Sequence, residues 1–361
     1  MALSNKASRR KVIEPHLKSI GNLRPIFTSL NGDHSWLMSF PRPASEVKEH
    51  GKAFFHIVYE PWLEGGANFL PSFLINITMV QNPAIKDAAA VEALVQEIEE
   101  LAAQRLGIDH TAASQNNKDG YTGGIDLILL CFDFRDHVHE ATLRKFDPRI
   151  PVLASTNAER AVTSWNHFKN IEILSDLPFH SRAWQLSEKE APRYMPTWLT
   201  TRRLLSDRPL NCMLVIVWTR LANVSNLEKH EAILIAAHGV QMDNVFIQAF
   251  LKSEPETIKL AMLHNLKDSF AAGAQNTFGA KSGLALYRAL DDCDYWIATH
   301  DGQLSYTGII LRLLFTADKP RTLEWALTEE EAERIADDKP KVLRRDPTIT
   351  RVDNGGSLVL V

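Results

Sequence analysis

Histidine and aspartate side chains follow several apolar segments of this chain, at points where a buried strand is expected to end. The segment IDLILLC (125–131) runs directly into FDFRDH (132–137). An aspartate next to a histidine at a strand end suits acid–base chemistry or metal binding. A structural role is the alternative, because Asp136 precedes the helical pattern HEATLRKF and is placed to cap that helix. Local sequence alone favours the cap.

Three further segments have the same form, an apolar run followed by a histidine. EAILIAAHGV contains His238, TIKLAMLHNL contains His264, and DYWIATHDGQ contains His300 and Asp301. A single histidine of this kind is usually a hydrogen-bonded core residue. Four such sites in one chain predict a common pocket, provided that the strands are neighbours in packed sheets and their ends meet.

The elements expected to position these residues are strands and helices in alternation. Residues 27–60 alternate apolar runs with turn signals, which predicts antiparallel strands, and residues 86–106 have helical spacing. Apolar strand runs and helical segments then alternate, as in α/β layering. Strands return over residues 198–236 and predict a second, meander-like sheet. The order predicts the α/β (α+β) class, with two sheets flanked by helices in an αββα sandwich.

Composition limits the function classes. The chain has 361 residues, 45% of them hydrophobic and 23% charged, with a net charge of −4. This length suffices for a large core and an enclosed pocket, and the charge offers no basic surface for nucleic acid. We expect no membrane span, because no apolar run approaches the roughly 18 residues required.

The cysteines and the N-terminus bear on the compartment. The three cysteines are scattered and odd in number, which argues against a disulfide framework and fits a reducing compartment. The N-terminal segment is polar and basic and has no apolar signal-peptide core. The sequence therefore predicts a cytoplasmic protein.

The blocks that contain these residues resemble the metallo-β-lactamase fold, in particular a fungal group of predicted metal-dependent hydrolases. The matching stretches are SLNGDHSWLMSFPRP, EPWL, LLCFDFRDHVHEATLRKFDPRIPVLAS, SWNHF, EAILIAAHGV and NTFGAKSGLALYRALDDCDYWIATHDG. They extend over most of the chain. We therefore expect one metallo-β-lactamase-like domain over residues 27–338, with an insertion at 84–124. Residues 1–26 are expected to form a flexible tail, and residues 339–361 a C-terminal tail.

The family's metal motif, His-x-His-x-Asp-His at a strand end, aligns with residues 132–137. Asp136 and His137 match it, whereas Phe132 and Phe134 replace its histidines. The family's next ligand falls near Asp207, where the chain has no histidine. Phenylalanine has no lone pair to donate to a metal, so a two-ion hydrolytic site is not expected. The resemblance leaves at most one ion of zinc or another divalent metal, for which the remaining ligands are Asp136, His137, Asp207, His238 and His300.

The two phenylalanines predict a dry, apolar pocket that suits proton transfer or the holding of an apolar substrate. We expect the catalytic residues to be Asp136, His137, His238, His300 and Asp301. We expect the substrate-binding residues to be Phe132, Phe134, His264, Asp207 and Trp296.

The function expected from this pocket is that of a metal-independent enzyme without a cofactor. It would isomerise or cyclise a small hydrophobic molecule, such as a terpenoid or polyketide intermediate of fungal secondary metabolism. One alternative is a hydrolase of the lactonase or esterase kind with a single metal ion. The other is a non-catalytic pseudoenzyme.

Overall fold

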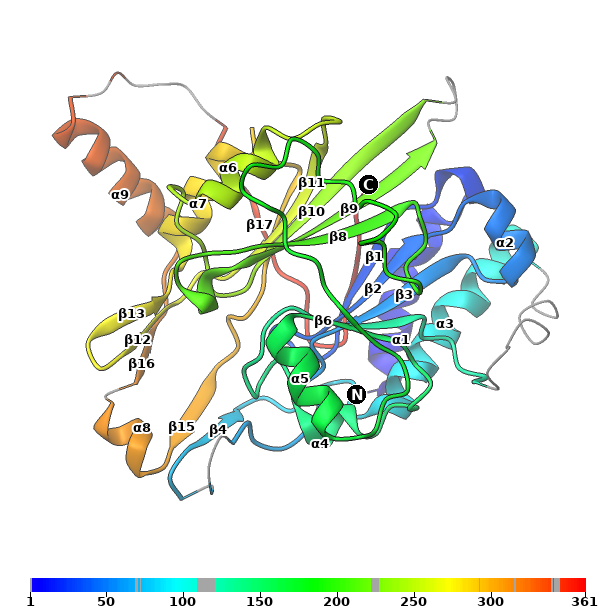
Figure 1. Cartoon of the computed structure of the whole chain (residues 1–361), viewed down its shortest axis with the longest axis horizontal. Helices are drawn as coiled ribbons and strands as arrows, with labels where there is room; N and C mark the ends of the chain where they lie inside the picture. The colour runs from blue at the N-terminus through cyan, green and yellow to red at the C-terminus, as the bar shows by residue number, and fades with distance from the viewer. Residues whose placement is uncertain are drawn as a thin grey trace.

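A computed structural model describes residues 2–68, 71, 73–108, 121–221, 227–291, 293–314, 316–338, 340 and 345–361. Most of its strands lie in two sheets, one of seven strands in the order β18-β1-β2-β3-β5-β6-β7 and one of six in the order β17-β14-β11-β10-β9-β8 (Figure 1). The first sheet contains β1 (Ile26–Ser29), β2 (Trp36–Pro41), β3 (Phe54–Tyr59), β5 (Leu127–Leu130), β6 (Val152–Ala154), β7 (Ile171–Ile173) and β18 (Ser357–Val359). The second contains β8 (Leu199–Leu204), β9 (Met213–Leu221), β10 (Glu228–Ala236), β11 (Ile258–His264), β14 (Tyr295–Ala298) and β17 (Ile349–Thr350).

Helices cover the outer faces of both sheets (Figure 1). On the first sheet these are α1 (Ala2–Ile13), α3 (Ala88–Leu106) and α5 (Thr156–Ser164), and on the second α6 (Val245–Leu251) and α7 (Ala280–Ala289), with α9 (Leu323–Ala336) packed against α7. The shorter helices are α2 (Ala44–His50), α4 (Glu140–Leu143) and α8 (Ile309–Leu313). No helix among the described residues is both long and apolar enough to cross a membrane.

The apolar core lies in three separate clusters, which correspond to the interfaces between four layers. One cluster joins the first sheet to α1, α3 and α5, the second lies between the sheets, and the third joins the second sheet to α6, α7 and α9. Strand β9 shows the reason, because Leu214 and Ile216 contribute to the middle cluster while Met213 and Val215 contribute to the outer one. Successive side chains of a strand point to opposite faces, so a strand covered on both faces must be apolar throughout. The predicted αββα sandwich is confirmed.

Each large sheet contains a set of parallel strands, whose carboxyl ends lie along the same edge of the sheet, so that residues following those strands can meet there. Strands β3, β5, β6 and β7 are parallel to one another, as are β10, β11, β14 and β17. The predicted meander at 198–236 is confirmed by the antiparallel set β8, β9 and β10. Two small sheets lie apart from the two large ones (Figure 1). One is formed by β12 (Asp268–Ala271), β13 (Ala274–Thr277) and β16 (Ala317–Lys319), and the other by β4 (Asn76–Met79) and β15 (Leu304–Thr307).

Both ends of the chain differ from the tails expected from the sequence. Residues 2–13 form α1, in which Ile13 is buried and Arg9 donates a hydrogen bond to the Gly355 carbonyl at 2.9 Å. At the other end, β17 and β18 each complete a sheet edge. The expected insertion provides α3, which buries an apolar face against the first sheet. Residues 109–120 of that insertion, and 339 and 341–344 of the expected tail, lie outside the described residues.

Candidate functional site

Three of the predicted histidines meet at the carboxyl ends of strands from both sheets. His137 follows β5, His238 follows β10 and His300 follows β14. Their rings are buried, and one nitrogen of each lies within 4.8 Å of those of the other two. Nε2 of His137 is 3.0 Å from Nε2 of His238. The expected convergence of strand ends is therefore observed for these three residues.

A buried carboxylate orients His137. Glu60 follows β3, the neighbour of β5, and its Oε2 is 2.5 Å from Nδ1 of His137. Its Oε1 accepts hydrogen bonds from the backbone N–H groups of Cys131 and Phe132 at 2.9 and 3.0 Å. Glu60 has a φ of 44°, which is uncommon for a residue other than glycine. The carboxylate fixes the direction of the ring, so that Nε2 of His137 faces the other two histidines.

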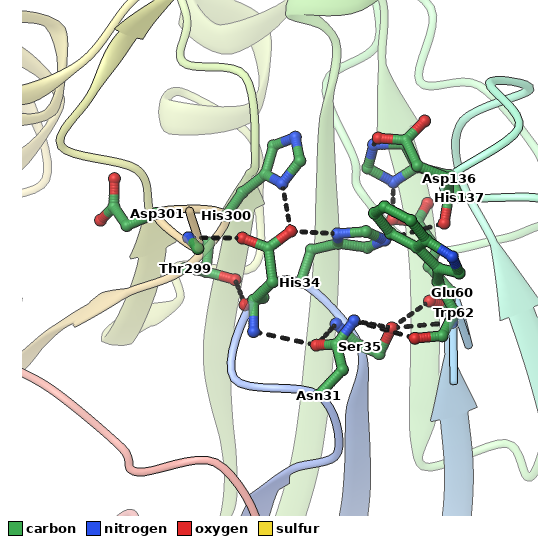
Figure 2. Close-up of polar contacts among 12 residues, drawn as sticks. Asn31, His34, Ser35, Glu60, Trp62, Asp136, His137, Thr299, His300 and Asp301 are labelled. Carbon is green, nitrogen blue, oxygen red and sulfur yellow. Dashed lines mark hydrogen bonds and ion pairs between the residues drawn. The ribbon is translucent and has the colours of Figure 1, made fainter. Parts of the chain in front are cut away.

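A second buried carboxylate orients His300. Asp33 lies in the loop between β1 and β2, and its Oδ2 accepts hydrogen bonds from Nδ1 of His300 and Nδ1 of His34, both at 2.9 Å. Nε2 of His34 donates to the backbone carbonyl of Asp136 at 3.0 Å. Figure 2 shows His34 between His300 and the pair formed by Asp136 and His137. The loop after β1 thus connects the half of the site on the first sheet with the half on the second.

Burial and neighbouring charges set the protonation of the cluster. Burial lowers the pKa of His137, but Glu60 and Asp136 outweigh it and raise this pKa to about 9. Burial and the charges of His300 and His137 hold the pKa of His238 well below its usual value. In the absence of an ion, these two shifts favour a protonated His137 beside a neutral His238.

The donor set fits one divalent metal ion. Imidazole nitrogens about 2.0–2.1 Å from a tetrahedral zinc lie about 3.3 Å apart, close to the 3.0 Å between His137 and His238. Glu60 and Asp33 each accept from the Nδ1 side of a ring, and such carboxylates usually accompany metal-binding histidines. Asp136 lies beside the cluster, with Oδ2 3.6 Å from Nε2 of His137 and its side chain 16% exposed. An ion would take the place of the proton that the two histidines share.

Phe132 and Phe134 lie beside the histidines of the candidate site. The ring of Phe132 is buried, with its centroid 4.9 Å from that of His137 and 5.0 Å from that of His238. The ring of Phe134 lies 6.4 Å from His238 and is partly exposed. Both rings border the histidines and neither provides a ligand atom, while their role in substrate binding stays a prediction.

His264 and Trp296 do not join this cluster, in contrast to the prediction. Nδ1 of His264 is hydrogen-bonded to the Asn265 carbonyl at 2.7 Å, and Nε2 faces the Ser282 hydroxyl at 3.4 Å. Nε1 of Trp296 donates to the His264 carbonyl at 3.3 Å, and its ring packs in the outer core under α7. Both side chains therefore lie on the face of the second sheet that is covered by helices.

Asp301 and Asp207 also lie apart from the histidines. Oδ1 of Asp301 accepts from the backbone N–H groups of Leu266 and Lys267 at 2.8 and 2.9 Å, which holds a turn. Figure 2 shows Asp301 on the far side of His300. Asp207 is exposed in the loop between β8 and β9. In the described part of the chain, neither aspartate belongs to a group of side chains that could hold a metal.

Sequence reasoning missed Asp33, His34 and Glu60. Asp33 and His34 lie in the block SLNGDHSWLM and Glu60 in EPWL, both of which belong to the resemblance. The available signal was a charged residue at the end of an apolar run, as in FFHIVYE. All three side chains are almost fully buried, which is rare for charged residues without partners.

No protein-family model matches the chain, and neither does any curated protein sequence. Similar solved structures include an isothiocyanate hydrolase from Delia radicum gut bacteria, with 14% identity, a TM-score of 0.47 and coverage of 93% of this chain and 99% of that chain. A possible metal-dependent hydrolase from Veillonella parvula has 9% identity and a TM-score of 0.46, covering 94% and 100%. The metallo-β-lactamase fold protein YhfI from Bacillus subtilis has 9% identity and a TM-score of 0.41, covering 93% and 99%. By the sheet order and packing of its own chain, the protein has a four-layer sandwich of the metallo-β-lactamase type.

Proposed function

We propose that this protein is a hydrolase that uses one divalent metal ion, held by His137, His238 and His300, with Asp136 beside them. The observation that carries this proposal is the convergence of three buried imidazole nitrogens, two of them on rings oriented by carboxylates. Imidazole ligands suit zinc, and also iron and other first-row metals. When bound, such an ion supplies a Lewis acid that polarises a carbonyl oxygen.

The residues around the site would assist hydrolysis in distinct ways. Glu60 and Asp33 hold the histidine rings in place, and Phe132 excludes water from the closed side. Asp136 is on the partly exposed side, and although burial raises its pKa, His137, His34 and His300 bring it below the ordinary value. This direction holds for the metal-free protein, and a bound cation would likewise favour the carboxylate form, so that Asp136 could accept a proton from an attacking water. The partly exposed ring of Phe134 suits a small ester or lactone with an apolar portion.

A metal-independent isomerase or cyclase is the second candidate function, and one observation favours it. Glu60, His137 and His238 form a hydrogen-bonded series in which His137 carries a proton and His238 can accept one. Such a pair could move a proton between two positions of an apolar substrate. The third nitrogen, on His300, has no role in that series, and the hydrolase accounts for it. Membership in the fungal group and a role in secondary metabolism remain predictions from the resemblance.

Metal uptake and its effect on hydrolysis separate the two candidates. Purified protein would be stripped of metal, titrated with zinc, manganese or iron(II), and tested on a panel of small esters and lactones. We expect one ion per chain and hydrolysis that disappears on chelation and returns with metal. Absence of uptake at micromolar zinc, in protein that remains folded, would overturn the hydrolase. The exposed variant Asp207→Ala is the matched control, with unchanged uptake expected.

A further inference from the structure

Asp33 is hydrogen-bonded to one short loop, residues 299–302, through both its backbone and its side chain. Its carbonyl oxygen accepts from Oγ1 of Thr299 at 3.1 Å and from the backbone N–H of His300 at 3.2 Å. Its carboxylate accepts from Nδ1 of His300 at 2.9 Å and from the backbone N–H of Gly302 at 2.7 Å. One residue between β1 and β2 thus holds the whole turn that carries His300.

That turn has an unfavourable backbone conformation. His300 has a φ of 55°, in the left-handed region that residues other than glycine rarely adopt. Conformations of this kind persist where the surroundings impose them, and they concentrate at functional sites. At Gly302 a Cβ atom would lie 2.8 Å from Oδ1 of Asp33, so the carboxylate approaches this closely because glycine has no side chain. The turn therefore accommodates Asp33 in two ways, through the backbone conformation of His300 and through the absence of a side chain at Gly302.

The same carboxylate also connects the turn to the other half of the site. Oδ2 accepts from His34, whose Nε2 donates to the carbonyl of Asp136, the residue before His137. The rings of His34 and His137 lie 4.3 Å apart between centroids. A displacement of Asp33 would therefore alter the tautomer of the His300 ring and also its position relative to His137.

We propose that Asp33 is a positioning residue for the candidate metal site and determines its affinity for the ion. This inference rests on the proposed function. Asp33 acts through His300, because an acceptor at Nδ1 keeps the proton there and leaves Nε2 as the ring nitrogen with a lone pair for an ion. Asp33 is 3% exposed, so water does not replace it as the acceptor.

Asp33→Asn tests the proposal, because the amide has one acceptor oxygen where the carboxylate has two. Zinc affinity would be measured by competition with a chelating dye, and we expect a loss of about 10- to 100-fold. Glu99→Gln is the matched control, since Glu99 is also buried and hydrogen-bonded to a histidine, His56, outside the site. The control should bind zinc within about 2-fold of the native affinity, the scatter expected of a change remote from the ligands. Equal affinity of Asp33→Asn and the native protein would overturn the proposal.

A second measurement separates this proposal from the metal itself. Nitrogen chemical shifts of the His300 ring in the metal-free protein report its tautomer, and we expect the proton on Nδ1 in the native protein and a mixture in Asp33→Asn. If the native protein bound no zinc, the proposed function would fail, while an altered tautomer in the variant would still support the positioning role. An unchanged tautomer would contradict it. Should Asp33→Asn fail to fold, Gly302→Ala displaces the carboxylate without removing its charge and should weaken zinc binding.

Discussion

Two buried networks in this protein pair a histidine with a glutamate, and they differ in the partner of the second ring nitrogen of that histidine. In the candidate site Glu60 accepts from Nδ1 of His137, and Nε2 faces another histidine. In the core, Nε2 of His56 is bonded to Oε1 of Glu99 at 2.9 Å and Nδ1 to the hydroxyl of Ser39 at 2.8 Å. The core network therefore uses both ring nitrogens within the fold, whereas in the site one nitrogen remains for an ion or a proton.

The backbone of the two networks differs as well. Ser39, His56 and Glu99 lie within β2, β3 and α3, where the dihedral angles are regular. Glu60 and His300 lie just beyond strand ends, and both have positive φ. Burial and a carboxylate partner are thus common to His56 in the core and His137 in the candidate site. What distinguishes the candidate site is that ring nitrogens of three histidines beyond strand ends face one another, and that one of these histidines, His300, has a positive φ.

The largest effect that would separate the networks is loss of metal binding in His137→Ala. A zinc site gains several kcal/mol from each ligand, so zinc affinity should fall by about 100- to 1,000-fold. His56→Ala should retain one ion per chain, as measured by elemental analysis after dialysis. The comparison would fail if His56→Ala lost the ion or if His137→Ala bound it as tightly as the native protein.

The second-largest effect should be a loss of stability when the core network of Ser39, His56 and Glu99 is disrupted. His56→Ala leaves the Glu99 carboxylate buried with only backbone donors and should lower the free energy of unfolding by about 3 kcal/mol. Denaturant unfolding of the metal-free protein measures this loss. Since Ser39 would also lose its partner, Ser39→Ala combined with His56→Ala should cost less than the sum of the single changes. Strict additivity would show that the three side chains do not act as one network.

A third buried histidine sharpens the comparison through its pH dependence. Burial lowers the pKa of His264 to about 4, below the usual value of 6.5. The unfolded chain therefore takes up a proton more readily than the folded one. The contribution of His264 to the free energy of unfolding is therefore fully present above pH 6.5. It decreases by up to about 3 kcal/mol as the pH falls toward 4. The unfolding free energy should decrease less steeply between pH 7 and 4.5 in His264→Gln than in the native protein, and equal slopes would contradict the assignment.

The smallest effect is expected at Asp207, which the sequence placed in the pocket. Its side chain is exposed and lies outside the histidine cluster, so Asp207→Ala should change stability by less than about 0.5 kcal/mol. Zinc stoichiometry and hydrolysis should match those of the native protein. A clear loss of affinity would mean that the loop between β8 and β9 reaches the site in solution.

Sequence reasoning identified the histidines of the candidate site better than the carboxylates that are hydrogen-bonded to them. His137, His238 and His300 follow apolar runs, and such runs identify strand ends because a doubly covered strand must be apolar throughout. Asp33 and Glu60 could not be assigned in this way, because their partners lie far along the chain and are brought near only by strand pairing and by the packing of the two sheets. The prediction of tails at both ends was wrong for the same reason, because α1 and β18 are stabilised by contacts with segments far along the chain.

The sequence by itself determined the layered architecture and the set of histidines from which the site is drawn. Tertiary structure alone decided which of them belong to it. His264 follows an apolar run just as His238 does, but it is the last residue of β11 and shares the face of Met262, which packs under the helices. Trp296 lies on that same face of β14. Successive side chains alternate between the two faces of a strand, so strand ends and sheet packing determine whether a histidine reaches the site or fills the core.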